Sequence, residues 1–235
     1  MDSAAQSSNV VLASLSADDF EAIRPHLRTV ELSPERRLIR LGEAITQVYL
    51  PHSGVVSFIV ELAAGERVEV AMVGRDSIVG ASAALGILVG VTEAVVLLPG
   101  TASVIDVDRF RAAVERSEAL RTTLVRHGQA LFVQAQQTAG CNASHSVEAR
   151  LARWLLRVRD LSGSNHFTLT QELMAQMIGA RRNSVSIVAN TLQQARYIRY
   201  SRGHVEILDL DGLTGLACEC YGAVKAQYER LRLPM

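Results

Sequence analysis

Short segments in the first half of the chain alternate apolar and polar residues with a period of two. In the segment 67–72 the apolar residues Val68, Val70 and Met72 alternate with other residues, and we expect all three to face inward, into the core of the β-roll. Comparable segments, separated by turns that contain glycine or proline, lie at residues 29–32, 48–50, 55–60, 95–98 and 103–107. Many short strands with such turns predict an antiparallel β-roll, or jelly roll, in residues 1–117.

A helical pattern follows at residues 108–139, with a break near residues 116–117. Beyond the break, Leu120, Leu124 and Leu131 fall on one stripe. A second stripe, advanced by one residue, contains Phe132, Ala135 and Ala139. Because a surface helix needs only one buried face, the second apolar face should pack on another domain or another chain. A helix sandwiched inside its own domain is the alternative.

We expect residues 118–141 to be a dimerisation helix, since a parallel pair of such helices would be self-complementary about a two-fold axis. The interface residues that we predict are Leu120, Leu124, His127 and Leu131. His127 would lie near the axis, although a histidine at this spacing can also be an ordinary packing residue with satisfied nitrogens.

Residues 142–235 carry the pattern of a winged helix. Thr170 can cap a helix over residues 171–178, and Gly179 can end it in the left-handed conformation. A third helix begins within three residues of this glycine, which predicts a helix-turn-helix. Residues 197–208 are then typical of a hairpin whose tip is basic.

The third helix is expected to bury Val185 and Leu192, which turns a face without carboxylates outward. In the major groove, arginine suits guanine, asparagine suits adenine, and an aliphatic side chain suits the thymine methyl group. The base-reading residues that we predict are Arg182, Asn183, Ser186 and Ile187.

Charge is divided unequally along the chain, although its formal net charge is zero. Residues 1–141 carry 12 arginines against 16 acids, a net of −4, whereas residues 142–235 carry 12 basic residues against 8 acids, a net of +4. The window 181–204 contains five arginines and no acid. Such a block can be a solvated face, but beside a helix-turn-helix and a basic hairpin it indicates double-stranded DNA as the partner.

Composition narrows the class of protein further. Apolar residues make up 49% of the 235 residues and charged residues 20%, which suits packed cores and argues against a disordered chain. The longest uncharged apolar stretch, residues 81–91, is too short to cross a bilayer, so we expect no membrane partner. The first residues lack the features of a secretion signal, so we expect the cytoplasm and reduced cysteines.

The segments TLTQELMAQMIGARRNSVS (168–186) and YIRYSRG (197–203) resemble the DNA-binding domain of the CRP/FNR family of bacterial transcription regulators. The resemblance implies an α+β fold with a cyclic-nucleotide-binding-like β-roll, a dimerisation helix and a C-terminal winged helix-turn-helix. It also implies a homodimer that binds a near-palindromic site, senses a signal in the β-roll and reorients its reading heads. An activator of this family would also contact RNA polymerase.

The family's base-reading and phosphate-binding positions match this chain only in part. Arg182 falls where the family commonly places a guanine-reading arginine, and Asn183 where a glutamate is often found. Ile187 replaces a second base-reading arginine of the cAMP-responsive members, so their operator should not be assumed. Contacts to phosphates, which fix register without reading sequence, are predicted for Thr170, Gln171, Arg181, Ser184, Arg199 and Arg202.

The family's nucleotide pocket is matched poorly. Members that bind cyclic nucleotides have a Gly-Glu pair for the ribose and an Arg-Ser or Arg-Thr pair for the phosphate, whereas this chain has GASAAL at 80–85 and VTE at 91–93. A phosphate buried without a cation costs several kcal/mol, which argues against a cyclic nucleotide. Backbone amides after Gly80 can still hold an anion. The effector-pocket residues that we retain are Gly80, Ala81, Ser82 and Thr92.

Other cofactors and activities find little support, so the cofactor is unknown. An FNR-type iron–sulfur cluster needs several cysteines near the N-terminus, but none precedes Cys141, and there is no haem signature. Cys218 and Cys220, spaced C-x-C, can join a metal site, sense oxidation or simply pack in a helix.

The competing functions are an enzyme and a binding module. A cupin-like enzyme needs two or three converging histidines and a carboxylate, but His26 and His52 lack this arrangement, so we predict no enzymatic activity and no metal site. The alternative function is a cyclic-nucleotide or other small-ligand binding module that acts through protein partners.

Overall fold

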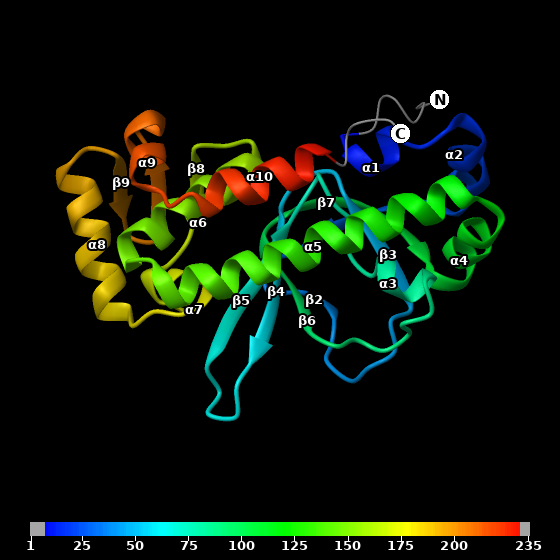
Figure 1. The fold of residues 1–235 in the computed structure, drawn as a ribbon, viewed down its shortest axis with the longest axis horizontal. Coiled ribbons are helices and arrows are strands. Elements are labelled where there is room, and N and C mark those ends of the chain that lie inside the picture. The colour runs from blue at the N-terminus through cyan, green and yellow to red at the C-terminus, as the bar shows by residue number, and fades with distance from the viewer. Residues whose placement is uncertain (1–7, 231–235) are drawn as a thin grey trace.

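A computed structural model describes residues 8–230 of the chain, and its first part is the β-roll that the sequence predicts (Figure 1). One antiparallel sheet has the strand order β1-β7-β3, and the other has the order β2-β6-β4-β5. The strands are β1 Arg28–Leu32, β2 Arg37–Ile39, β3 Gln47–Pro51, β4 Val55–Glu61, β5 Arg67–Val73, β6 Glu93–Leu98 and β7 Gly100–Asp106. The sequence pattern missed β2, which is only 3 residues long.

Short helices cover the ends of the β-roll. They are α1 Val10–Ala13, α2 Ala17–Ile23, the 3-10 helix Arg24–His26, α3 Ala81–Ala84 and α4 Val107–Arg116. Ser16 caps α2, since its hydroxyl accepts a hydrogen bond from the Asp19 backbone N–H at 3.1 Å. Between the two sheets the core consists mostly of branched aliphatic side chains, which suit a pleated surface.

The long helix α5, Glu118–Ser144, crosses the front of the molecule in Figure 1. Ser117 separates it from α4, and the Ser117 hydroxyl accepts a hydrogen bond from the Leu120 backbone N–H at 3.0 Å. The cap stabilises the start of α5, and the predicted break near residues 116–117 is confirmed.

The residues predicted for the dimer interface lie on the face of α5 that packs against the β-roll of their own chain. Leu120 and Leu124 are each only 1% exposed and pack into the core of their own β-roll, and Leu131 lies partly buried against the same core. The outward face instead carries Val125 and Phe132, which are 56% and 57% exposed. The periodicity showed two apolar stripes but contained nothing to say which of them meets the β-roll.

His127 belongs to the buried face as well, and it is a packing residue. Its Nε2 accepts hydrogen bonds from the Ile78 backbone N–H at 3.1 Å and from the Ser77 hydroxyl. Burial lowers the pKa of His127 to about 4, so the ring is neutral near pH 7. It therefore fixes the loop after β5 to α5 and is not available at a two-fold axis.

The C-terminal part is a winged helix. Its elements are α6 Val147–Ser162, β8 His166–Thr168, α7 Gln171–Met177, α8 Arg182–Gln194, β9 Ile198–Ser201, β10 His204–Ile207, α9 Leu210–Leu216 and α10 Cys220–Arg230, with the sheet order β8-β10-β9. The Thr170 hydroxyl caps α7, and Gly179 has a φ of +60° in the turn before α8. Both local predictions are confirmed. Within residues 8–230, no helix is long and apolar enough to span a bilayer.

The winged helix packs directly on the outer face of the sheet that contains β4 and β5. Met72, 1% exposed, shares a core with Trp154 and other apolar residues of α6. The prediction that Met72 faces the β-roll core is wrong, because the β4–β5 register shifts between the Ala71–Phe58 and Glu69–Ile59 pairs and leaves Val70 unpaired. Such a bulge changes which side chains share a face. Helix α10 then returns along α5 (Figure 1).

Candidate nucleic-acid interface

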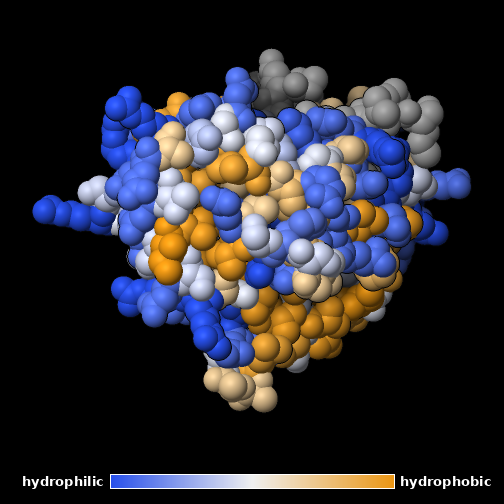
Figure 2. Space-filling model, turned by 60° about the vertical axis from the view of Figure 1, so that its left-hand side comes forward, coloured by the Kyte–Doolittle hydropathy of each residue, from blue (hydrophilic) through white to orange (hydrophobic). Residues whose placement is uncertain are grey.

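The first turns of α8 present a polar surface to solvent. Arg182, Asn183 and Asn190 are exposed, and Ile187 is 68% exposed. Val185, which is fully buried, anchors the opposite face of α8 in the winged-helix core. The face that we predicted to read bases is therefore free of contact with the protein's own core. Figure 2, turned to bring the winged-helix end forward, shows mainly hydrophilic side chains (blue) on its left and upper parts.

Hydroxyl and amide groups at the margin of this face are already engaged within the helix-turn-helix. Ser186 is half-buried, and its hydroxyl donates to Gln171 Oε1 at 2.5 Å, which ties α8 to the start of α7. Thr170 uses its oxygen to cap α7 but keeps its hydroxyl hydrogen free to donate to a phosphate. Ser184 is half-buried on the first turn of α8.

Two of the predicted DNA-binding arginines have acidic neighbours that the window 181–204 did not contain. Arg199 Nη1 lies 2.5 Å from Glu206 Oε2, and Arg182 Nε lies 3.8 Å from Glu172 Oε2. The arginines of both pairs are well exposed, so each pair contributes little to stability and can open to a phosphate or a base. Arg202 is exposed at the hairpin turn, where its φ is +49°.

The β4–β5 hairpin lies beside the turn of the helix-turn-helix. A cavity of about 580 Å³ separates residues 64–68 of the hairpin from α7 and from the turn, and Arg181 lines it. A Cβ atom at Gly179 would lie 3.3 Å from Val68 Cγ1, so glycine at this turn serves both the positive φ and the close approach of the hairpin.

The four predicted effector-pocket residues are closely packed or already hydrogen-bonded within the β-roll. Gly80 is so closely packed that a Cβ atom there would lie 2.7 Å from the Gln47 carbonyl oxygen. Ala81 is buried in the β-roll core, and Ser82 is half-buried in α3. Thr92 donates its hydroxyl hydrogen to the Ile59 carbonyl at 2.8 Å.

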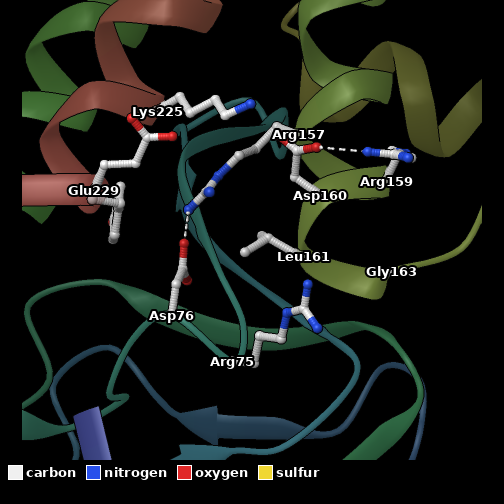
Figure 3. A pocket seen from close by; sticks show the side chains of 10 residues that line it. Arg75, Asp76, Arg157, Arg159, Asp160, Leu161, Gly163, Lys225 and Glu229 are labelled. Carbon is white, nitrogen blue, oxygen red and sulfur yellow. Dashed lines mark hydrogen bonds and ion pairs between the residues drawn. The ribbon is translucent and has the colours of Figure 1, made fainter. Parts of the chain in front are cut away.

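A pocket of about 360 Å³ lies instead between the two domains, as Figure 3 shows. It is lined by Arg75, Asp76, Arg157, Arg159, Asp160, Leu161, Gly163, Lys225, Tyr228 and Glu229. Sequence reasoning missed it, because its walls come from the loop after β5, from α6 and from α10, which are far apart in the chain.

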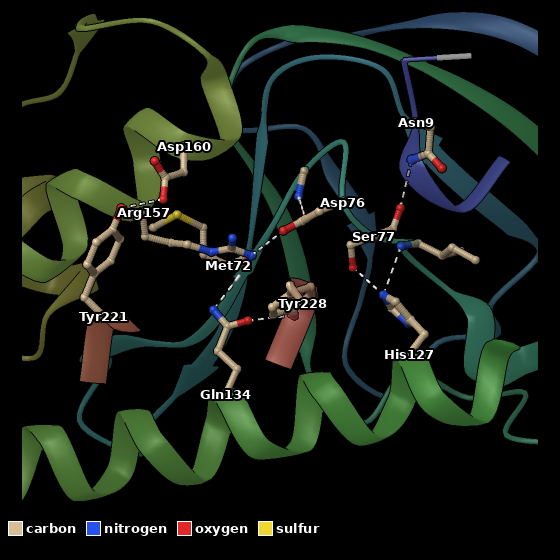
Figure 4. Close-up of polar contacts among 12 residues, drawn as sticks. Asn9, Met72, Asp76, Ser77, His127, Gln134, Arg157, Asp160, Tyr221 and Tyr228 are labelled. Atoms are coloured by element: carbon tan, nitrogen blue, oxygen red, sulfur yellow. Dashed lines mark hydrogen bonds and ion pairs between the residues drawn. The ribbon is translucent and has the colours of Figure 1, made fainter. Parts of the chain in front are cut away.

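A buried polar network closes the inner side of this pocket (Figure 4). Arg157 Nη2 donates to Asp76 Oδ2 at 2.7 Å, and its guanidinium lies 4.5 Å from the centre of the Tyr228 ring. Gln134 of α5 donates to the Met72 carbonyl at 3.1 Å and accepts from the Tyr228 hydroxyl at 2.8 Å. The β-roll, α5, α6 and α10 therefore meet in one hydrogen-bonded junction.

A second buried carboxyl group joins the domains at the β5–α6 contact. Glu69 is 5% exposed, and it accepts hydrogen bonds from Trp154 Nε1 at 2.8 Å and from the Ser57 hydroxyl at 2.5 Å. Burial raises the pKa of Glu69 to about 7, although these two hydrogen bonds and the charges of Arg153 and Arg157 act in the opposite direction.

We expect Glu69→Gln to flatten the pH dependence of stability. Because the folded-state pKa of Glu69 lies above the value of 4.5 for an unperturbed glutamate, its contribution to stability is fully present below pH 4.5 and is lost as the pH rises through about 7. The wild type should lose about 2 kcal/mol relative to the variant between pH 5 and pH 8, measured by urea unfolding. Glu66→Gln, at an exposed residue, is the control. Parallel pH profiles for the wild type and Glu69→Gln would contradict the assignment.

Sequence comparison identifies the C-terminal domain. Residues 149–216 match the family of Crp-like helix-turn-helix domains. This match covers the helix-turn-helix and its wing, whose geometry is described above. Among curated proteins, no sequence matches the chain.

Solved structures share the fold over most of the chain. FixK2 of Bradyrhizobium japonicum is 14% identical with a TM-score of 0.70, covering 82% of this chain and 98% of its own. A CRP/FNR-family transcriptional regulator of Thermus thermophilus is 20% identical with a TM-score of 0.66, covering 81% and 98%. The c-di-GMP responsive regulator CLP of Xanthomonas campestris is 16% identical with a TM-score of 0.66, covering 82% and 99%. These likenesses extend over the β-roll, the long helix and the winged helix.

Proposed function

We propose that the chain is a homodimeric, sequence-specific DNA-binding regulator of the CRP/FNR family; its Crp-like helix-turn-helix domain and the fold that it shares with solved regulators support the proposal. The observation that carries the proposal is the exposed face of α8, on which Arg182, Asn183 and Ile187 point to solvent. Thr170, Arg181, Ser184 and Arg202 lie around it, where phosphates would fix the register.

The outward stripe of α5 supports a dimer. Val125 and Phe132 are large apolar side chains that stay more than half exposed in the single chain. On the same helix, the space beside Gly128 and Gly140 is open, so a second helix can approach closely. A second copy that packs α5 against α5 would cover this stripe and place two reading heads on a near-palindromic site. Leu120, Leu124, His127 and Leu131 stay inside each β-roll.

The signal that such a regulator senses would act through the domain junction. The buried contacts of Glu69, Met72 and Asp76 with α6 fix the reading head on the β-roll. A ligand or modification that changes these contacts would reorient α8, which is the regulatory mechanism we propose. An activator would also contact RNA polymerase. The alternative is a ligand-binding module that acts through protein partners.

Substitutions at two arginines should separate base reading from phosphate binding. We expect Arg182→Ala to cost about 1–3 kcal/mol on the specific site and to relax the preference at one base position per half-site. Arg202→Ala should weaken binding to all sequences alike and flatten the salt dependence, because it removes a phosphate contact. Binding-site selection from random duplexes and salt titrations test both.

Arg109→Ala, at an exposed arginine of α4 in the β-roll, is the control and should leave DNA binding unchanged. Equal losses on specific and random DNA for both Arg182→Ala and Arg202→Ala would contradict the assigned roles.

A further inference from the structure

Three cysteines and one histidine converge where the long helix meets the C-terminal domain. Cys141 lies in the last turn of α5, His145 caps its end, and Cys218 and Cys220 flank the start of α10. One donor atom from each residue lies within 4.8 Å of the other three. Cys141 Sγ and Cys218 Sγ are 3.5 Å apart, and Cys220 Sγ lies 3.6 Å from His145 Nδ1.

We propose that these four residues form a Cys₃His site for a divalent cation of the zinc type. Zinc in structural sites takes four sulfur and nitrogen ligands in a tetrahedron, with Zn–S distances of about 2.3 Å and sulfur atoms therefore roughly 3.7 Å apart. The observed separations need only small side-chain rotations to reach this geometry. The site departs from the expectation, stated above, that the chain binds no metal.

The groups around the four ligands are those that orient metal ligands. His145 Nε2 lies 3.2 Å from Glu219 Oε1, so the carboxylate holds the ring hydrogen on Nε2 and leaves the Nδ1 lone pair directed at the cysteines. Gln137 Nε2 donates a hydrogen bond to Cys220 Sγ at 3.0 Å, and such a bond would stabilise a metal-bound thiolate. Simple packing of neutral thiols needs neither arrangement.

The electrostatic surroundings also favour a metal thiolate site. Arg150 and Arg153 are 7% and 6% exposed, and both interact electrostatically with Cys141. A zinc ion with three thiolates and a neutral histidine carries one net negative charge, which would compensate this buried positive charge.

The main alternative is a disulfide between Cys141 and Cys218. A disulfide would not account for the positions of His145, whose Nδ1 lies 3.6 Å from Cys220 Sγ, and of Gln137, which donates to Cys220 Sγ. A metal ion would join the end of α5 to the start of α10, and so fix the position of the winged helix relative to the long helix. This role does not depend on DNA binding.

Metal analysis of the full-length protein tests the site. We expect the reduced protein, incubated with zinc and passed through gel filtration, to retain about one zinc ion per chain by elemental mass spectrometry. His145→Ala and Cys218→Ser should each weaken retention more than about tenfold, whereas His166→Ala, at an exposed histidine of the same domain, should retain zinc as the wild type does. Chelator treatment should lower the thermal midpoint of the wild type and leave that of His145→Ala unchanged.

A cobalt titration of the metal-free, reduced wild type keeps the test independent of how the variants fold. Tetrahedral thiolate coordination should give intense sulfur-to-cobalt charge-transfer absorption together with the d–d bands of a four-coordinate ion. The proposal is overturned if the wild type retains no zinc and shows no such absorption. It is overturned equally if the variants keep the metal, or if intact mass shows a Cys141–Cys218 disulfide in protein purified with zinc.

Discussion

Replacing Phe132 with glutamate is expected to convert the proposed dimer into monomers and to lower affinity for a palindromic operator by roughly two to four orders of magnitude. Phe132 is 57% exposed in the single chain, so the substitution leaves the fold of each protomer intact. In the proposed dimer the new carboxylate would be buried in the α5–α5 interface opposite the same carboxylate of the second copy, which is strongly unfavourable. Without the dimer each half-site is bound separately, and the gain from simultaneous binding is lost.

Sedimentation velocity and operator titration measure the two effects of Phe132→Glu. Val91→Glu is the matched control, because Val91 is 78% exposed and lies in a β-roll loop away from α5. Leu124→Glu should behave differently, since Leu124 is 1% exposed and its substitution should unfold the β-roll. A dimer that persists in Phe132→Glu would show that the dimer interface lies on another surface.

The contrast between Leu124 and Phe132 shows what the sequence could and could not determine. The break at Ser117, the cap at Thr170 and the left-handed turn at Gly179 were predictable, because each depends on a few neighbouring residues. The choice between the two stripes of α5 depends on where the β-roll packs. That information is tertiary, and the helical period does not contain it.

The candidate sites were likewise predictable only where they depend on neighbouring residues in the sequence. The exposed face of α8 followed from the burial of Val185 and Leu192 on one helix, and the structure places both in the core. The Cys141 and Cys218 sulfurs come together only because α10 returns along α5, and a strand bulge at Val70 decides which β5 side chains meet α6. The C-x-C spacing of Cys218 and Cys220 was visible in the sequence, but the sequence did not show that Cys141 and His145 lie beside them.

Arg157→Met should lower the free energy of unfolding by about 3–5 kcal/mol, because it leaves Asp76 as a buried charge without its partner. The side chains of Arg157 and Asp76 are 10% and 8% exposed, and their atoms lie 2.7 Å apart (Figure 4). Arg157 also contacts the Tyr228 ring and donates to the Met72 carbonyl. Methionine retains the apolar stem and removes the charge, so the effect reports the buried ion pair rather than a cavity.

A double variant and an exposed pair complete the experiment. Adding Asp76→Asn to Arg157→Met should restore part of the lost stability, since it removes the buried negative charge that no longer has a partner. Arg111→Met, which breaks the pair with the 88% exposed Asp108 at 3.1 Å, should cost less than about 1 kcal/mol. Urea unfolding at pH 7 measures all four proteins. If Arg157→Met cost no more than Arg111→Met, the ion pair would not hold the junction, and the docking of the winged helix would depend on the apolar core that contains Met72 and Trp154 and on the hydrogen bond from Trp154 to Glu69.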